Sequence, residues 1–235
     1  MSFSLLSFGN TGYGDELFWG AVRTVEIAVF AYAFGISLGL CGAMGKLSGG
    51  RWIKNILEGY TTLVRAVPEL VLILLLYYAG TDGLNKILMS IGFQPIVLNG
   101  LVAAVFVLGF VQGAYSTEVL RAAIQAVPIG QIEAAKAYGM SPFLRFRRIV
   151  LPAMLPYAIP GLANLWLNIT KDSALISAVG FTELALATKQ AAGVSKQYLM
   201  FYLVTAMIYL SITLFSNQIF GWLERRVRRG QQKLA

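Results

Sequence analysis

The 235-residue sequence contains no histidine and a single cysteine, Cys41. Without histidine, the chain cannot form a Ser-His-Asp triad, a histidine-ligated metal site or a histidine proton switch. One cysteine excludes a disulfide within the chain and a metal site built from several cysteines. The chain also lacks paired catalytic groups and any cofactor motif, so we predict no catalytic, cofactor or metal site.

Charge is also scarce, because charged residues make up 13% of the chain and apolar residues 57%. This share of charge is about half of that in a soluble domain. It argues against an ordinary soluble enzyme and against a disordered segment. The net charge of +8 would suggest nucleic acid as the partner of a soluble protein. Here the placement of the basic residues explains the charge, and we expect no nucleic-acid partner.

The few charges leave long uncharged stretches. Four of these stretches are between 19 and 31 residues long, and a helix needs about 20 residues to cross the hydrocarbon of a bilayer. A fifth apolar stretch carries Arg65 and Glu69 within it. We therefore predict an all-α membrane protein with a single domain, residues 1–235, and five transmembrane helices. The predicted spans are 17–45, 56–79, 96–118, 152–170 and 198–223.

The basic residues are divided unevenly between the loops. The loops 46–56, 118–148 and 224–235 hold thirteen Lys and Arg residues, whereas the N-terminus and the loops 80–96 and 171–196 hold four. Basic loops stay in the cytoplasm. We therefore expect the N-terminus outside the cytoplasm and the C-terminus inside it.

The segment 128–150 is predicted to be cytoplasmic and is the most informative part of the chain. Pro128 is suited to a helix start and Gly139 to a helix end. Ser141 is a favourable N-cap ahead of Pro142. This pattern predicts two short helices joined at a sharp corner.

The same segment resembles the signature loop of permease subunits of bacterial ABC importers. Their pattern is Glu-Ala-Ala, three residues, Gly, nine residues and Ile-x-Leu-Pro. It matches 133–135, Gly139 and 149–152 without a gap. The resemblance implies a coupling helix that docks on a separate ATP-binding subunit. The residues that it assigns to this coupling are Glu133, Ala134, Ala135 and Gly139.

Three further segments are similar to the permeases of polar amino acids: 65–70 with its Arg-x-x-Pro, 113–121, and 171–175. The resemblance runs from about residue 17 to 225. It is strongest to the permeases for histidine, lysine, arginine and ornithine, or for opines. It implies the type I ABC importer permease fold in a bacterial inner membrane, with a periplasmic N-terminus and alternating access powered by ATP. The implied partners are the lipid bilayer, two ATP-binding subunits that bind ATP and Mg²⁺, a second related permease and a periplasmic binding protein.

Glu69 is the first candidate for substrate contact, because it lies near the middle of the predicted second span. An ionisable group at that depth is costly and indicates function, and Pro68 can kink the helix towards a cavity. A carboxylate there could accept the cationic side chain of a basic amino acid. The alternative is a structural ion pair with Arg65, one helical turn away.

Other polar residues of the spans have two possible roles. Gln112, Asn164 and Asn168 could line the path or form hydrogen bonds between helices. Glu118 and Arg121, three residues apart, are expected to form a structural ion pair. Lys171 and Asp172 are expected to cap or orient the following loop, and the small residues around Cys41 predict close helix packing.

The competing function is an amino acid carrier driven by an ion gradient. Such carriers need membrane carboxylates for ion coupling and often contain a second, inverted half. Only Glu69 suits the first requirement, and five spans cannot be divided into two equal halves.

Overall fold

The computed structural model describes residues 3–9, 12–96 and 99–228, and every regular element within them is a helix. Five of the helices are long and apolar enough to cross a membrane, which is the number predicted. They are α1 (Gly14–Ser48), α3 (Glu69–Ser90), α4 (Gly100–Gln125), the helical stretch Pro142–Val179 and α9 (Tyr198–Val227). The predicted third span began at residue 96 and so included 97–98, which lie outside the described residues.

The second predicted span, 56–79, is not one helix. The amphipathic helix α2 (Arg51–Ala66) ends at Ala66, the backbone of the next residue, Val67, is extended, and α3 begins at Glu69. Proline disfavours helical geometry in the residue before it and has no N–H to donate, so Pro68 breaks the helix where a kink was expected. The candidate span is α3, which continues to Ser90.

The centre of the fold is the close packing of α1 against α4. Gly35, Gly39 and Gly42 are buried along one face of α1. A Cβ atom on Gly35 would lie 2.7 Å from the Gln112 side chain, and one on Gly39 would lie 2.8 Å from the backbone of Ser116. Only glycine allows the two helices this close an approach. Cys41 itself is exposed, so its glycine neighbours form the packing surface and the cysteine does not.

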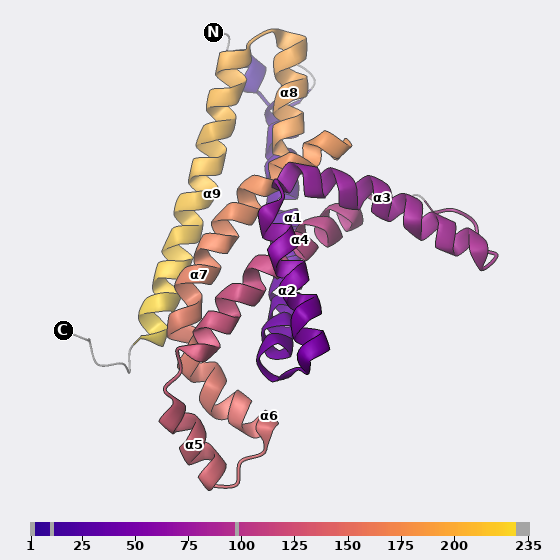
Figure 1. The fold of residues 1–235 in the computed structure, drawn as a ribbon. Helices are drawn as coiled ribbons and strands as arrows, with labels where there is room; N and C mark the ends of the chain where they lie inside the picture. Colours follow the sequence, from indigo (N-terminus) through magenta and orange to yellow (C-terminus); the bar gives the residue numbers. More distant parts are fainter. Residues whose placement is uncertain (1–2, 10–11, 97–98, 229–235) are drawn as a thin grey trace.

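Figure 1 shows how the remaining helices are arranged, and α2, α7 and α8 pack against one or both members of this pair. The stretch Pro142–Val179 comprises α6 (Pro142–Arg145), the π-helix η2 (Phe146–Val150), α7 (Leu151–Asp172) and the 3-10 helix η3 (Ser173–Val179). The predicted outer loop 171–196 contains a further helix, α8 (Leu184–Ser195), which packs against α1 and α9. A short 3-10 helix, η1 (Phe3–Leu6), precedes α1.

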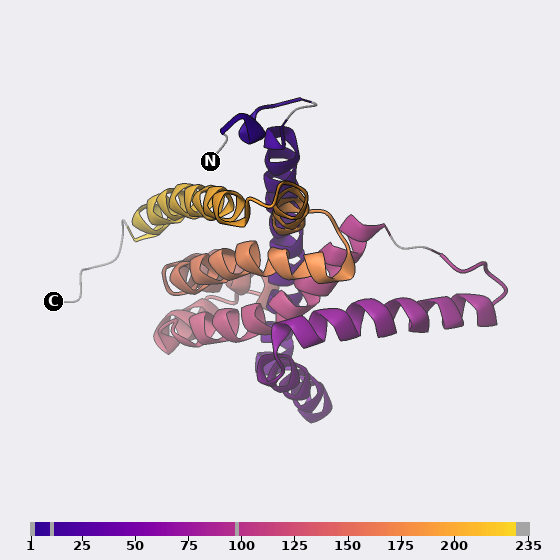
Figure 2. The same cartoon turned by 90° about the horizontal axis from the view of Figure 1, so that it is seen from above.

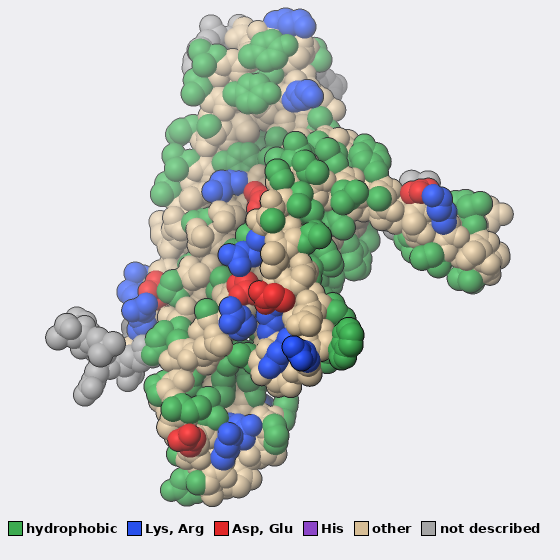
Figure 3. All heavy atoms as spheres, viewed as in Figure 1, with side chains coloured by type: hydrophobic (Ala, Val, Ile, Leu, Met, Phe, Trp, Pro, Cys, Tyr) green, Lys and Arg blue, Asp and Glu red, His purple; other side chains and the backbone are tan. Residues whose placement is uncertain are grey.

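The two expected short helices of 128–150 are present as α5 (Ile129–Ala137) and α6. Pro128 precedes α5, and the Ser141 hydroxyl accepts a hydrogen bond from Leu144 N at 3.4 Å. They form the lower end of the molecule in Figure 1. Figure 2 shows α3 projecting away from the other helices, and most of its large apolar side chains are exposed. Figure 3 shows most Lys and Arg side chains in the lower half of the view.

Candidate functional site

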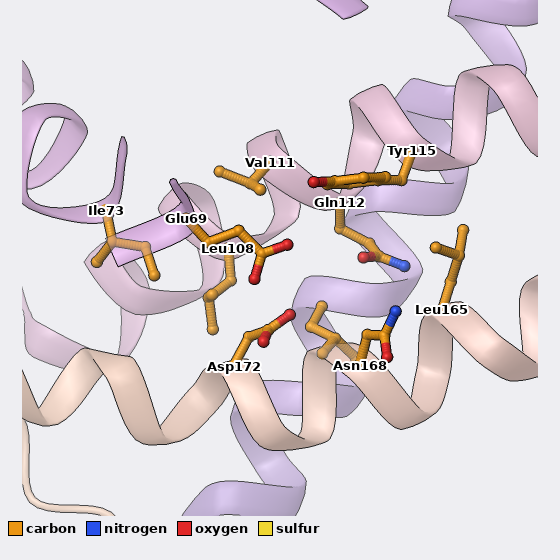
Figure 4. Close-up of a pocket in the computed structure, with 10 residues that line it drawn as sticks. Glu69, Ile73, Leu108, Val111, Gln112, Tyr115, Leu165, Asn168 and Asp172 are labelled. Atoms are coloured by element: carbon orange, nitrogen blue, oxygen red, sulfur yellow. The ribbon is translucent and has the colours of Figure 1, made fainter. Parts of the chain in front are cut away.

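A small polar pocket lies where α3 begins and α7 ends, with α4 between them (Figure 4). The break at Pro68 places Glu69 in the first turn of α3, where the helix dipole favours a carboxylate. Asp172 is the last residue of α7. Ten residues line the pocket: Glu69, Ile73, Leu108, Val111, Gln112, Tyr115, Leu165, Asn168, Ile169 and Asp172.

The carboxylates of Glu69 and Asp172 both point into this pocket (Figure 4). Among the described residues, neither carboxylate forms an ion pair with a lysine or arginine. Two neighbouring carboxylates repel each other and favour the arrival of a positive charge. The pocket is therefore suited to a cation.

Gln112 supplies a hydrogen-bond donor to the pocket, whereas the two carboxylates are acceptors. Its side chain is 4% exposed, and its Nε2 has no hydrogen-bond partner among the described residues. A buried donor without an acceptor costs about 1–3 kcal/mol. The amide points into the pocket beside Asn168 (Figure 4), so a ligand with an acceptor oxygen would satisfy it.

The free space in the pocket is about 20 Å³, which is room for about one water molecule and far too little for an amino acid. However, Glu69, Tyr115, Asn168 and Asp172 are only half-buried, so the pocket reaches the surface of the chain. The pocket is therefore open at the surface of this chain.

The structure brings together three of the four expected path residues. Glu69, Gln112 and Asn168 line the pocket, whereas Asn164 is exposed and lies outside it. Asp172 was expected to cap a loop, but its side chain makes no capping hydrogen bond and lines the pocket. The sequence holds a signal for this, because Asp172 is four residues after Asn168 and so shares its helix face.

The expected pair of Arg65 and Glu69 is absent from the ion pairs of the described residues. The prediction assumed one continuous helix through both residues. With Pro68 between two helices, the i, i+4 geometry that would bring them together does not exist.

Glu118 and Arg121 do form an ion pair, with Arg121 Nη2 2.7 Å from Glu118 Oε2. The pair belongs to a larger network that the sequence analysis missed. Lys46 of α1 is buried, and its Nζ lies 2.6 Å from Glu118 Oε1 and 2.5 Å from Glu58 Oε2. The same Nζ donates to the hydroxyl of Thr61 at 2.7 Å. This network joins α1, α2 and α4.

A buried carboxylate, Glu183, was also missed. It caps α8 by accepting hydrogen bonds from the N–H groups of Ala185 at 2.8 Å and Leu186 at 2.9 Å. It also accepts from the hydroxyls of Thr24 on α1 and Tyr209 on α9. Burial raises the pKa of the Glu183 carboxyl, and the hydrogen bonds act in the opposite direction. Glu183 thus joins three helices.

The four residues assigned to coupling differ in accessibility. Glu133 and Ala134 are exposed on α5, whereas Ala135 is buried within the chain and offers no docking surface. Gly139 follows α5 with a φ of +70°, a conformation that favours glycine. Tyr138 and Phe143, which the sequence analysis did not single out, are 86% and 73% exposed at the same corner.

Comparisons with known proteins agree with this architecture. The chain is 41% identical over 222 residues to the histidine/lysine/arginine/ornithine transport system permease protein of Escherichia coli (strain K12), covering 94% of this chain and 97% of that protein. It is 41% identical over 232 residues to the nopaline transport system permease protein of Agrobacterium fabrum (strain C58 / ATCC 33970), covering 98% of each.

A crystal structure of an amino acid ABC transporter with histidines superposes with a TM-score of 0.75 at 30% identity, covering 91% of this chain and 95% of that chain. A family model, described as the binding-protein-dependent transport system inner membrane component, matches residues 31–229. The chain therefore belongs to the family of inner membrane components of binding-protein-dependent transport systems.

Proposed function

We propose that this chain is a permease subunit of an ATP-driven importer and that the importer carries basic amino acids. The permease role follows from the family, since its relatives are permease subunits of amino acid and opine importers. None of these relatives supports the alternative of an ion-driven carrier. The basic substrate is supported by one observation above the others: Glu69 and Asp172 face one pocket without a cationic partner among the described residues.

The polar groups of the pocket match the two ends of a basic amino acid. A guanidinium or ammonium group can bind the two carboxylates, and a guanidinium can do so with paired hydrogen bonds. The buried donor of Gln112 suits the carboxylate at the other end of the substrate. Neutral amino acids would gain only the second contact, so the carboxylates would favour basic substrates.

Because the pocket is too small for an amino acid and is open at the surface of the chain, we propose that a second, related permease chain completes the substrate site. Alternating access then exposes the shared site first to a periplasmic binding protein and later to the cytoplasm. The uneven distribution of basic residues supports an orientation with α5 and α6 in the cytoplasm and the start of α1 on the periplasmic side. The chain is a multi-pass protein of the inner membrane.

The coupling element of this proposal is the corner formed by α5 and α6. Its exposed residues, including Glu133, Ala134, Tyr138 and Phe143, would enter a groove of the ATP-binding subunit. Two such subunits bind ATP and Mg²⁺ and supply the energy. Gly139 shapes the corner because its left-handed backbone reverses the chain after α5.

The test is substrate uptake by the assembled transporter in proteoliposomes, with Glu69→Gln and Asp172→Asn compared with the unchanged protein. Each substitution removes a charge and keeps the shape of the side chain. A hydrogen bond to a charged group contributes about 1.5–3 kcal/mol, so we expect arginine uptake at low concentration to fall about 10-fold or more. Glutamine uptake should change little.

The matched control is Asp82→Asn, which removes an exposed carboxylate from the same helix as Glu69. Asp82 pairs with Lys86 at 2.7 Å and lies outside the pocket. Its arginine uptake should equal that of the unchanged transporter. An equal loss of arginine and glutamine uptake in Glu69→Gln and Asp172→Asn would contradict a direct role of the carboxylates in substrate recognition.

A further inference from the structure

Another hollow lies at the α5–α6 end of the molecule, away from the pocket that contains Glu69 and Asp172. It is a groove of about 890 Å³ between the end of α1, the end of α4 and the helices α5 and α6. This volume is in the range of sites for small organic molecules. Apolar side chains form most of its surface, among them Met44, Ile129, Ile132 and Phe146.

Two cations lie among these apolar side chains. Lys136 of α5 and Arg145 of α6 both line the groove, and no aspartate or glutamate does. Neither cation forms an ion pair with a carboxylate of the described residues. The groove therefore combines an apolar surface with an unbalanced positive charge, which suits an amphiphile with an anionic head.

The groove also adjoins the ends of three candidate spans. Its walls include the end of α1 at Ser48, the end of α4 at Gln125 and the start of the Pro142–Val179 stretch, and all three are candidate spans. These helices have 26 to 38 residues, more than the about 20 that the hydrocarbon requires, so their ends extend into the headgroup region or past it. Basic pockets between spanning helices on the cytoplasmic side of a membrane attract anionic headgroups.

We infer that this groove binds an anionic phospholipid. Lys136 and Arg145 contact its phosphate, and an acyl chain lies along Ile129, Ile132 and Phe146. Such a lipid would brace α5 and α6 against α1 and α4. The corner residues Tyr138 and Phe143 do not line the groove, so the lipid and the ATP-binding subunit would use different sides of the same corner.

The test is lipid binding to the assembled, delipidated transporter, titrated with phosphatidylglycerol or phosphatidylethanolamine and followed by native mass spectrometry. The main variant is Lys136→Gln with Arg145→Gln. Each basic residue near an anionic membrane surface contributes about 1 kcal/mol, so phosphatidylglycerol should bind about 30-fold more weakly. Binding of phosphatidylethanolamine should change less than about threefold on the same scale.

The matched control is Arg147→Gln with Arg148→Gln, because these exposed residues carry the same charge next to Arg145 but do not line the groove. A second variant, Ile129→Ser, changes an apolar residue that is 65% exposed and so is tolerated by the fold. It should weaken phosphatidylglycerol binding without removing charge.

The inference would be overturned if the Lys136/Arg145 variant and the Arg147/Arg148 variant weakened phosphatidylglycerol binding equally. The lipid would then be attracted by the overall positive charge and not by the groove. The inference would also be overturned if the Lys136/Arg145 variant lost the ATP-binding subunit but bound phosphatidylglycerol as before. That result would assign the groove to the ATP-binding subunit. The lipid titration measures no transport. A negative lipid result therefore leaves the proposed substrate specificity untouched, and a negative uptake result leaves the lipid site untouched.

Discussion

The buried lysine network allows a prediction whose size can be worked from the structure. The change is Lys46→Met, which keeps most of the length and volume of the side chain and removes its charge. Lys46 joins α1 to Glu58 and Thr61 of α2 and to Glu118 of α4. All three contacts are lost together, so the substitution should loosen α2 and α4 from α1.

The contacts of Lys46 contribute different amounts to the free energy of unfolding, because its partners differ in exposure to solvent. The Glu58 side chain is 70% exposed, so its pair with Lys46 contributes at most about 1 kcal/mol. The Glu118 side chain is 19% exposed. Breaking a buried pair costs about 3–5 kcal/mol when a charge is left unpaired, but Glu118 keeps Arg121 at 2.7 Å. We therefore expect a total loss of about 2–3 kcal/mol.

The assay is thermal unfolding of the assembled transporter, with double-mutant cycles that pair Lys46→Met with Glu118→Gln or with Glu58→Gln. For a chain of this size, the expected loss corresponds to roughly 4–12 °C in Tm. The cycle isolates each pairwise contribution. Lys46 should couple more strongly to Glu118 than to Glu58. Coupling to Glu58 that equals or exceeds coupling to Glu118 would refute the ranking by burial.

Three further predictions concern other parts of the molecule. Gly39→Ala should lower Tm, because overpacking costs about 1–3 kcal/mol. The control Gly59→Ala should leave Tm unchanged, since nothing lies within 4 Å of the new Cβ. Equal Tm values for the two variants would contradict the tight contact at Gly39. Gly139→Ala should reduce recovery of the ATP-binding subunit on purification more than Gly139→Asn or the open helical site Gly130→Ala, since asparagine tolerates positive φ. Glu183 lies between the candidate spans, and its raised pKa favours the protonated folded form, a contribution that is lost as pH rises through that pKa. The Tm advantage of the unchanged protein over Glu183→Gln should therefore shrink as the pH rises above 4.5, the ordinary pKa of glutamate, and a constant or growing advantage would refute this sign.

The sequence by itself determined the features that depend on composition and on neighbouring residues. Four long uncharged stretches and a fifth apolar stretch predicted the number of candidate spans, because hydrocarbon favours apolar side chains regardless of the neighbouring helices. Pro128, Gly139 and Ser141 predicted the two short helices, since each acts through the backbone of adjacent residues. The residues at fixed offsets in 133–152 indicated the family, because the whole motif lies within one short segment of the chain.

Pro68 is a local signal that acts more strongly than a kink. Pro68 was expected to bend a single span, whereas it ends α2 and lets α3 leave in another direction. The lost hydrogen bond and the extended residue before proline are local effects. How far the two helices then diverge is set by what each packs against.

Only the tertiary structure decided which distant side chains meet. Glu69 and Asp172 lie far apart in the chain, and α4 and α7 must pack beside the start of α3 before the two carboxylates share a pocket. The same holds for Lys46 with Glu118, and for Glu183 with Thr24 and Tyr209. Such contacts depend on how helix faces are turned towards one another. A charge pattern along one chain does not specify those rotations, because they result from the packing of all the helices together.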